Sequence, residues 1–195
     1  GDQAGYAVGG VGDLDGDGLA EIAVGARWDD DASVDAGSFR VLRVPSPPVH
    51  YPGSREDLFM FTAVESAALD RRLDIKIARA GDVLHVNWRS IQGTFDRVAP
   101  ILVAQFFTTG SPPGPYPGIS SVQINPFVSP GPFAVFDGNN VAIPVIMPPG
   151  GLSLSFLTPP GLVGNSVLFQ GMAVSPLSKN GIFATTHAHE FRFRP

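Results

Sequence analysis

The sequence of 195 residues contains no cysteine. This absence excludes disulfide bonds, iron–sulfur clusters, thiolate zinc sites and cysteine nucleophiles. Basic residues are in the minority, because 13 Lys and Arg face 18 Asp and Glu and leave a net charge of −5. Without a basic excess the chain lacks the charge that neutralises a phosphate backbone, so we expect no nucleic-acid partner.

Charge is almost missing from one long segment, Val98 to Ser178, where Asp137 is the only charged residue. Prolines interrupt this segment too often for a transmembrane helix, so we expect no membrane-spanning segment. Proteins in water normally scatter charges over exposed strands, which prevents them from sticking together. Two interpretations stay open: a neutral surface rich in small polar residues, or an interface between subunits.

The pattern of apolar residues predicts strands and few helices. Long helices are disfavoured by the 23 glycines and 19 prolines. Apolar and polar residues alternate in Leu73–Ile77 and Leu84–Arg89, which indicates half-buried antiparallel strands. Only Phe61–Arg72 has a helix-compatible pattern. We expect an all-β fold whose larger part is an antiparallel β-sandwich resembling a jelly roll. The other predicted strands are Asp57–Val64, Ile101–Phe107, Ser120–Ile124, Phe133–Phe136, Val141–Met147, Leu152–Leu157, Ser166–Val174 and Glu190–Arg194.

The distribution of charge divides the chain into two regions. Residues 1–35 contain nine acidic residues and one arginine, a net charge of −8, whereas residues 36–195 contain nine acidic and twelve basic residues, a net charge of +3. Between them, Val44–Gly53 reads VPSPPVHYPG, and its four prolines favour an extended linker. We therefore expect a small domain at 1–44, a Pro-rich linker at 45–53 and a β-sandwich domain at 54–195.

The small domain contains an acidic loop with the spacing of a calcium site. Calcium prefers six to eight oxygen ligands, and Gly16 and Gly18 allow the loop to curl around a small cation. An EF-hand would place a closing Glu at Val24, so that motif is excluded. The alternative is an acidic turn without metal, and any metal here is expected to be structural. The predicted calcium ligands are Asp13, Asp15, Asp17, the backbone carbonyl of Leu19, and Glu21.

Around this loop, residues 5–42 (GYAVGGVGDLDGDGLAEIAVGARWDDDASVDAGSFRVL) resemble the FG-GAP repeat, the blade of integrin-α-like β-propellers. Ala4–Gly5 replaces the family's Phe-Gly, and Glu21 replaces its usual final Asp. The resemblance implies a calcium-stabilised four-stranded blade from a secreted, surface or adhesive protein. The second domain resembles the tails that follow FG-GAP arrays in exported bacterial proteins.

The sequence contains one such blade, whereas a propeller needs four to eight. A single blade has open edges. Three explanations stay open: more blades precede residue 1, the blade docks on the second domain, or it pairs with a neighbouring chain.

Other candidate site residues are aromatic or histidine. Tyr116 and Trp88 are candidates for stacking on a ligand, although most aromatics of a sandwich belong to its core. His187 and His189 lie two residues apart, so in a strand they face the same side and could bind a transition metal. The alternative is a polar strand face. Because no nucleophile elbow, Walker loop or dinucleotide fingerprint occurs, we expect the protein not to be an enzyme.

These features together predict an extracellular or cell-surface structural or adhesive protein. Calcium would stabilise its blade, and the chain would assemble with copies of itself into a filament or surface layer through strand edges. The alternative is a carbohydrate- or ligand-binding module of a larger secreted protein, with surface glycans as partners. A fragment of a secreted hydrolase is a third interpretation.

Overall fold

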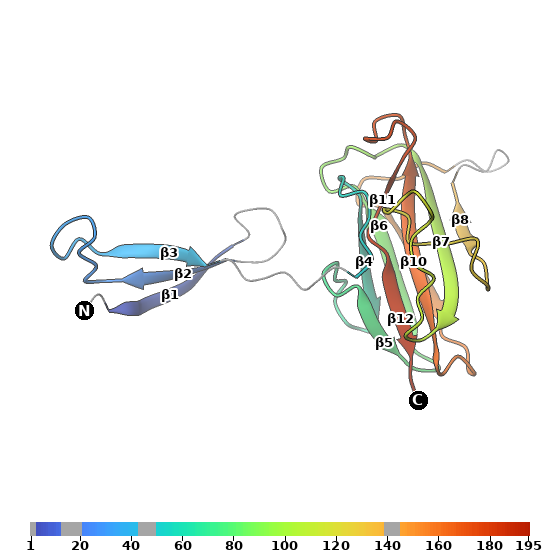
Figure 1. Ribbon diagram of the computed structural model, residues 1–195, viewed down its shortest axis with the longest axis horizontal. Coiled ribbons are helices and arrows are strands. Elements are labelled where there is room, and N and C mark those ends of the chain that lie inside the picture. Colours follow the sequence, from blue (N-terminus) through green and yellow to red (C-terminus); the bar gives the residue numbers. More distant parts are fainter. Residues whose placement is uncertain (1–2, 13–20, 43–49, 139–144) are drawn as a thin grey trace. The chain divides into compact units, whose positions relative to one another are not determined.

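The computed structural model describes residues 3–12, 21–42, 50–138 and 145–195. The chain divides into two compact units, Gly1–Pro48 (unit 1) and Val49–Pro195 (unit 2) (Figure 1). The division falls inside the predicted linker. The described residues form strands and turns without a helix, so none of their segments is a helix able to cross a membrane.

Unit 1 is an antiparallel meander in the order β1-β2-β3. Its strands are β1 (Ala4–Gly12), β2 (Glu21–Ala26) and β3 (Ser38–Leu42). Three strands are described here, whereas the resemblance implies a blade of four. Among the described residues of unit 1, only Glu21 is buried, with 3% of its surface exposed. The sheet therefore lacks a core of its own in this part of the chain.

Unit 2 contains two sheets (Figure 1). The larger has the order β5-β12-β10-β7-β8, with β11 also paired to β10, and the smaller has the order β4-β6-β9. All pairs are antiparallel except β5 with β12, which run parallel. The strands are β4 (Phe59–Val64), β5 (Ile75–Ala78), β6 (Val83–Arg89), β7 (Ala99–Thr108), β8 (Phe133–Asp137), β9 (Leu152–Leu157), β10 (Asn165–Val174), β11 (Phe183–Thr185) and β12 (His189–Phe193).

The two sheets of unit 2 share one hydrophobic core. Met60 and Trp88 of the smaller sheet belong to the same buried cluster as Leu102, Phe169 and Phe191 of the larger sheet. This cluster makes unit 2 a β-sandwich. The all-β fold predicted from the sequence is confirmed.

Three local predictions differ from the structure. Phe61–Arg72 is not a helix, because its first residues belong to β4 and pair with β6. Ser120–Ile124 is not a strand, because buried glutamine side chains rather than a neighbouring strand bind its backbone. The short strand β11 was not predicted. Of the predicted strand Val141–Met147, residues 141–144 lie outside the described residues, and the rest is not a strand.

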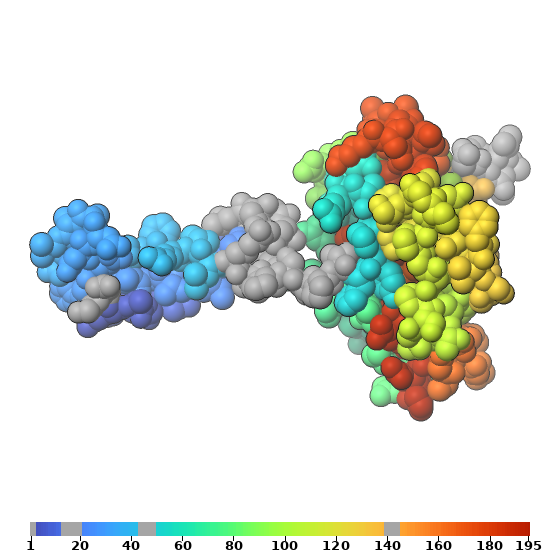
Figure 2. Space-filling view, in the orientation of Figure 1, coloured from blue at the N-terminus to red at the C-terminus, as the bar shows by residue number. Residues whose placement is uncertain are grey.

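Residues 50–53, predicted as the end of the linker, are bound to unit 2. The buried Tyr51 donates a hydrogen bond from its hydroxyl to Glu190 Oε2 at 2.6 Å. The carbonyl of Pro52 accepts one from Gln123 Nε2 at 2.8 Å, and Figure 2 shows this segment beside the connection between β7 and β8. The sandwich domain thus begins earlier than its proline content suggested.

Gly53 is required by a close approach of two backbones. A Cβ atom at this position would lie 2.3 Å from the carbonyl carbon and oxygen of Thr186 and 2.5 Å from the His187 nitrogen. Since backbone cannot move away as a flexible side chain can, even a methyl group would force the segment off the sandwich.

We expect Gly53→Ala to lower the free energy of unfolding of unit 2 by about 2 kcal/mol because of this overlap. Gly131→Ala is the matched control, since a Cβ there meets nothing within 4 Å. Urea unfolding followed by tryptophan fluorescence measures both variants. Equal midpoints for the two would contradict the close approach.

Candidate functional site

The predicted calcium loop connects β1 to β2. Asp13, Asp15, Asp17 and Leu19 lie outside the described residues, while Glu21 is the first residue of β2. Gly12, the last residue of β1, is the register partner of Glu21. The two residues that flank the predicted loop are therefore neighbours in the sheet. No group of three or more His, Asp or Glu that could hold a metal ion is present among the described residues.

At the opposite end of the same sheet, a second acidic segment connects β2 to β3. Asp29 accepts hydrogen bonds from the Asp31 amide at 3.0 Å and from the Ser38 hydroxyl. The Ser38 and Asp31 hydrogen bonds hold the pKa of Asp29 below its usual value. Asp30 accepts a hydrogen bond from the Asp35 amide at 2.8 Å. These carboxylates fix the shape of the connection, while the side chains of Asp31 and Asp35 are exposed.

Both faces of the unit 1 sheet carry exposed apolar side chains. On one face, a hollow of about 270 Å³ is lined by residues that include Val24 and Leu42. On the other, a hollow of about 330 Å³ lies beside Tyr6 and Phe39. Phe39 is 72% exposed and Val8 is 65% exposed. Such faces resemble protein surfaces that are covered by another sheet.

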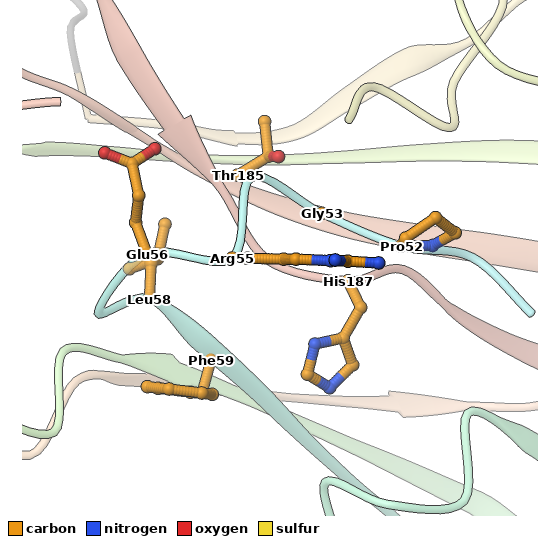
Figure 3. A pocket seen from close by; sticks show the side chains of 8 residues that line it. All are labelled: Pro52, Gly53, Arg55, Glu56, Leu58, Phe59, Thr185 and His187. Atoms are coloured by element: carbon orange, nitrogen blue, oxygen red, sulfur yellow. The ribbon is translucent and has the colours of Figure 1, made fainter. Parts of the chain in front are cut away.

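In unit 2, the segment that leads into β4 forms a hollow of about 360 Å³ together with Thr185 and His187. Figure 3 shows the rings of Phe59 and His187 on one side of this segment and the Glu56 carboxylate on the other. Glu56 Oε1 accepts a hydrogen bond from the Lys179 amide at 2.7 Å. The hollow is lined by apolar side chains, among them Leu58 and Phe59, and by polar ones, among them Glu56 and His187.

His187 and His189 do lie together, but they are held by protein atoms. Their rings stack with centroids 5.3 Å apart. His187 Nε2 donates to the carbonyl of Arg71 at 3.0 Å, and His189 Nδ1 is hydrogen-bonded to the Thr62 hydroxyl at 2.6 Å. Only His189 belongs to β12. The pair links β12 to β4 and to the Arg71 backbone.

Burial lowers the pKa of both histidines. Burial is the larger cause at His187, and at His189 it is reinforced by the neighbouring His187 and Lys76 charges. His189 Nε2 has no hydrogen-bond partner in the described part of the chain. A proton there would be a buried, uncompensated donor, so both rings are neutral near pH 7.

The two aromatic candidates for ligand stacking have different surroundings. Trp88 is 0% exposed and packs edge-on against Phe136 at 6.0 Å, so its prediction as a ligand-binding residue is wrong. Its position in β6 faces the core rather than solvent. Tyr116 is half-buried and lies 5.9 Å from the Phe127 ring, which is 74% exposed. The sequence leaves open whether Phe127 packs in the core or stacks on a ligand, because its exposure depends on how the connection between β7 and β8 folds back.

The sequence analysis also missed a set of residues on the outer face of the smaller sheet of unit 2. The guanidinium of Arg71 lies over the Phe59 ring, 5.0 Å from its centroid, and that of Arg89 lies over Phe61 at 4.3 Å. Beside them, His85 is hydrogen-bonded to Ser155 at 2.8 Å. Arg71 and Phe59 are 12 residues apart in the sequence, so no short motif predicts their contact.

Comparison with known proteins gives little similarity. No family model and no curated protein matches the chain. Among solved structures, the chain is similar to the crystal structure of a cellulose-active polysaccharide monooxygenase from M. thermophila (MtPMO3*), with 15% sequence identity and a TM-score of 0.34. The match covers 62% of this chain and 54% of that chain. The chain thus spans about half the length of that enzyme, and so low a TM-score carries no argument about activity.

This match nevertheless corrects one expectation. The match is to an enzyme, so it contradicts the prediction that the chain is not an enzyme, but it assigns no activity to this chain. The prediction rested only on missing sequence motifs. Motifs of that kind cover a few reaction classes and leave others unaddressed.

The buried histidines predict that acid destabilises unit 2. Because their pKa values lie below 6.5 in the fold, the unfolded chain binds more protons below that pH. The free energy of unfolding is therefore not reduced by these histidines above about pH 6.5. As the pH falls below this value, it decreases by at most about 1.4 kcal/mol per pH unit for each histidine. Thermal unfolding between pH 7 and about pH 5 measures the effect.

His189→Gln is expected to flatten this pH dependence, whereas His85→Gln on the outer face should leave it unchanged. If the variant with Gln at 189 fails to fold, the imidazole chemical shifts of the wild-type protein give the same information. A His189 that titrates near pH 6.5 would contradict a buried neutral ring.

Proposed function

We propose that the chain is a calcium-stabilised structural or adhesive protein that assembles with copies of itself through the sheet of unit 1. A filament or layer at the cell surface or outside the cell is the assembly that we favour. The observation that supports this proposal is the exposure of unit 1: among its described residues the sheet has open edges, two apolar faces and no core.

The edges of this sheet support pairing between chains. In the described residues, β1 and β3 each pair only with β2. β1 is nine residues long, AGYAVGGVG, and contains no charged residue and no proline. Edge strands of soluble proteins are usually protected by lysine, proline or short length. β1 has register shifts near both ends, but between them Ala7–Gly10 pairs regularly with β2 and leaves an uncharged edge on which a strand of a neighbouring chain can pair.

Energetics support the same conclusion. A sheet of three strands is stable when a hydrophobic face packs against another element. Val8 and Phe39 are largely exposed, and Leu42 is half-exposed. Burying side chains of this size contributes about 1.5–3 kcal/mol each. An assembly that covers them would stabilise both the sheet and the contact between chains.

Calcium enters the proposal through the acidic loop and the FG-GAP resemblance. The hairpin register of Gly12 and Glu21 brings the loop ends together, so that the carboxylates of the loop repel one another unless a cation binds. We propose that calcium neutralises this charge and orders the loop between β1 and β2.

A second candidate function is ligand binding by unit 2, and the exposed Phe127 favours it. Its ring forms a pair with Tyr116, and aromatic faces at a surface commonly stack on carbohydrate or on other planar groups. Binding to a glycan array that is lost in Phe127→Ala, but kept in Phe133→Ala, would support this function.

We expect Val8→Lys to weaken self-association at least tenfold, because a charge on β1 opposes pairing and burial. Val34→Lys is the control, since Val34 is 84% exposed but lies outside the strands. Sedimentation velocity over a range of protein concentrations measures both variants. A wild-type chain that stays monomeric at every concentration would exclude the proposed function.

Calcium binding is tested separately. Titration calorimetry with calcium measures binding. We expect binding to the wild-type chain, no binding to Asp15→Asn combined with Asp17→Asn, and preserved binding to Asp30→Asn combined with Asp31→Asn. The first pair removes two predicted ligands, and the second removes the same charge at the other end of the sheet. Equal affinities in the two double variants would contradict the assignment of the loop.

A further inference from the structure

Four residues on the outer face of the smaller sheet form a surface that none of the functions above uses. We call Phe59, Phe61, Arg71 and Arg89 the Arg–Phe face. Phe59 and Phe61 alternate along β4 with the fully buried Met60, so both rings point away from the core. Each ring is covered by one guanidinium, at 5.0 Å and 4.3 Å. The contact with a ring restrains each guanidinium group.

The carboxylates near this face are engaged elsewhere. Asp57 accepts hydrogen bonds from the Ser90 hydroxyl and from backbone amides of residues 91, 92 and 94. Although burial opposes it, these hydrogen bonds hold the pKa of Asp57 below its usual value. Asp70 accepts from the amides of Arg72 and Leu73, and Glu65 accepts from that of Val83.

Among the described residues, Arg71 and Arg89 therefore form no ion pair with a carboxylate. The ion pairs among the described residues join His50 with Asp74 and Arg192 with Glu190. Guanidinium groups bind carboxylates through parallel hydrogen bonds. Because stacking on phenylalanine restrains both groups, they lose little further freedom when an anion binds. The face therefore suits a ligand that presents at least two carboxylates.

The chain itself carries such a ligand in the acidic connection between β2 and β3. Asp29 and Asp30 fold this connection by accepting its own backbone amides. Asp31 and Asp35 remain exposed. Residues 1–35 have a net charge of −8, whereas residues 36–195 have a net charge of +3. This asymmetry is the complementarity that steers identical chains into a polar contact.

We propose that the acidic connection between β2 and β3 of one copy docks on the Arg–Phe face of the next copy. This inference rests on the proposed self-assembly and adds a second, polar contact to the pairing of unit 1 strands. Asp31 and Asp35 bind the guanidinium groups of Arg71 and Arg89. Since the two surfaces differ, the contact is head-to-tail, and an assembly of any length keeps one acidic connection free at one end and one Arg–Phe face free at the other.

Charge reversal tests the pairing directly. R71E/R89E alone and D31K/D35K alone are each expected to assemble at least tenfold more weakly than the wild-type chain, because like charges then meet. An equal mixture of the two variants is expected to assemble again, since every contact in an alternating chain joins opposite charges. R79E/R194E is the control, because it makes the same charge change at exposed arginines away from the face. Sedimentation velocity and negative-stain imaging measure all four samples.

The outcomes separate this inference from the proposed function. If the wild-type chain and R71E/R89E assemble equally, the chain self-associates but not through these arginines, and the inference is wrong. If the mixture does not recover assembly, the two surfaces are not partners. A monomeric wild-type chain excludes both proposals. A monomer that binds an acidic polysaccharide through Arg71 and Arg89 would identify a glycan as the occupant instead of a second copy.

Discussion

Two buried glutamines hold the outer layer of unit 2 in place. Gln105 and Gln170 are both fully buried, yet they belong to central strands of the larger sheet. Gln105 donates to three backbone carbonyls at residues 125, 128 and 130, and Gln170 bonds the backbone at residues 121, 123 and 186. Leaving these amides unpaired would cost about 1–3 kcal/mol each. They therefore fix the connection between β7 and β8 and the backbone against which Gly53 packs.

Through this backbone the glutamines also position the hollow beside His187. The Thr186 carbonyl accepts a hydrogen bond from Gln170, and the Thr186 backbone packs against Gly53. Gln170 therefore helps to hold the backbone on which the segment leading into β4 packs. β4 in turn presents Phe59 and Phe61 to the outer face. Gln170, buried beneath the connection between β7 and β8, thereby helps to position the backbone that lines the hollow.

The two units differ in what stabilises them. Unit 2 buries a shared core between two sheets, whereas the described strands of unit 1 expose both faces. Unit 1 also carries nine of the 18 acidic residues in about a quarter of the chain. The proposed calcium binding, strand pairing and docking on arginine each concern one part of this difference: charge repulsion in the loop, open strand edges, and exposed carboxylates. In all three proposals unit 1 would gain stability from partners outside itself.

The sequence by itself determined the all-β fold, the positions of most strands and the acidic character of unit 1, because alternation, turn residues and charge are local properties. It also placed His187 and His189 together. Only the tertiary structure decided that Trp88 is buried, that Ser120–Ile124 is bound by glutamine side chains, and that β5 pairs with β12 in parallel. It alone brought Arg71 over Phe59 and Arg89 over Phe61. Such contacts join residues that are distant in sequence, and their formation depends on packing and register, which no local pattern records.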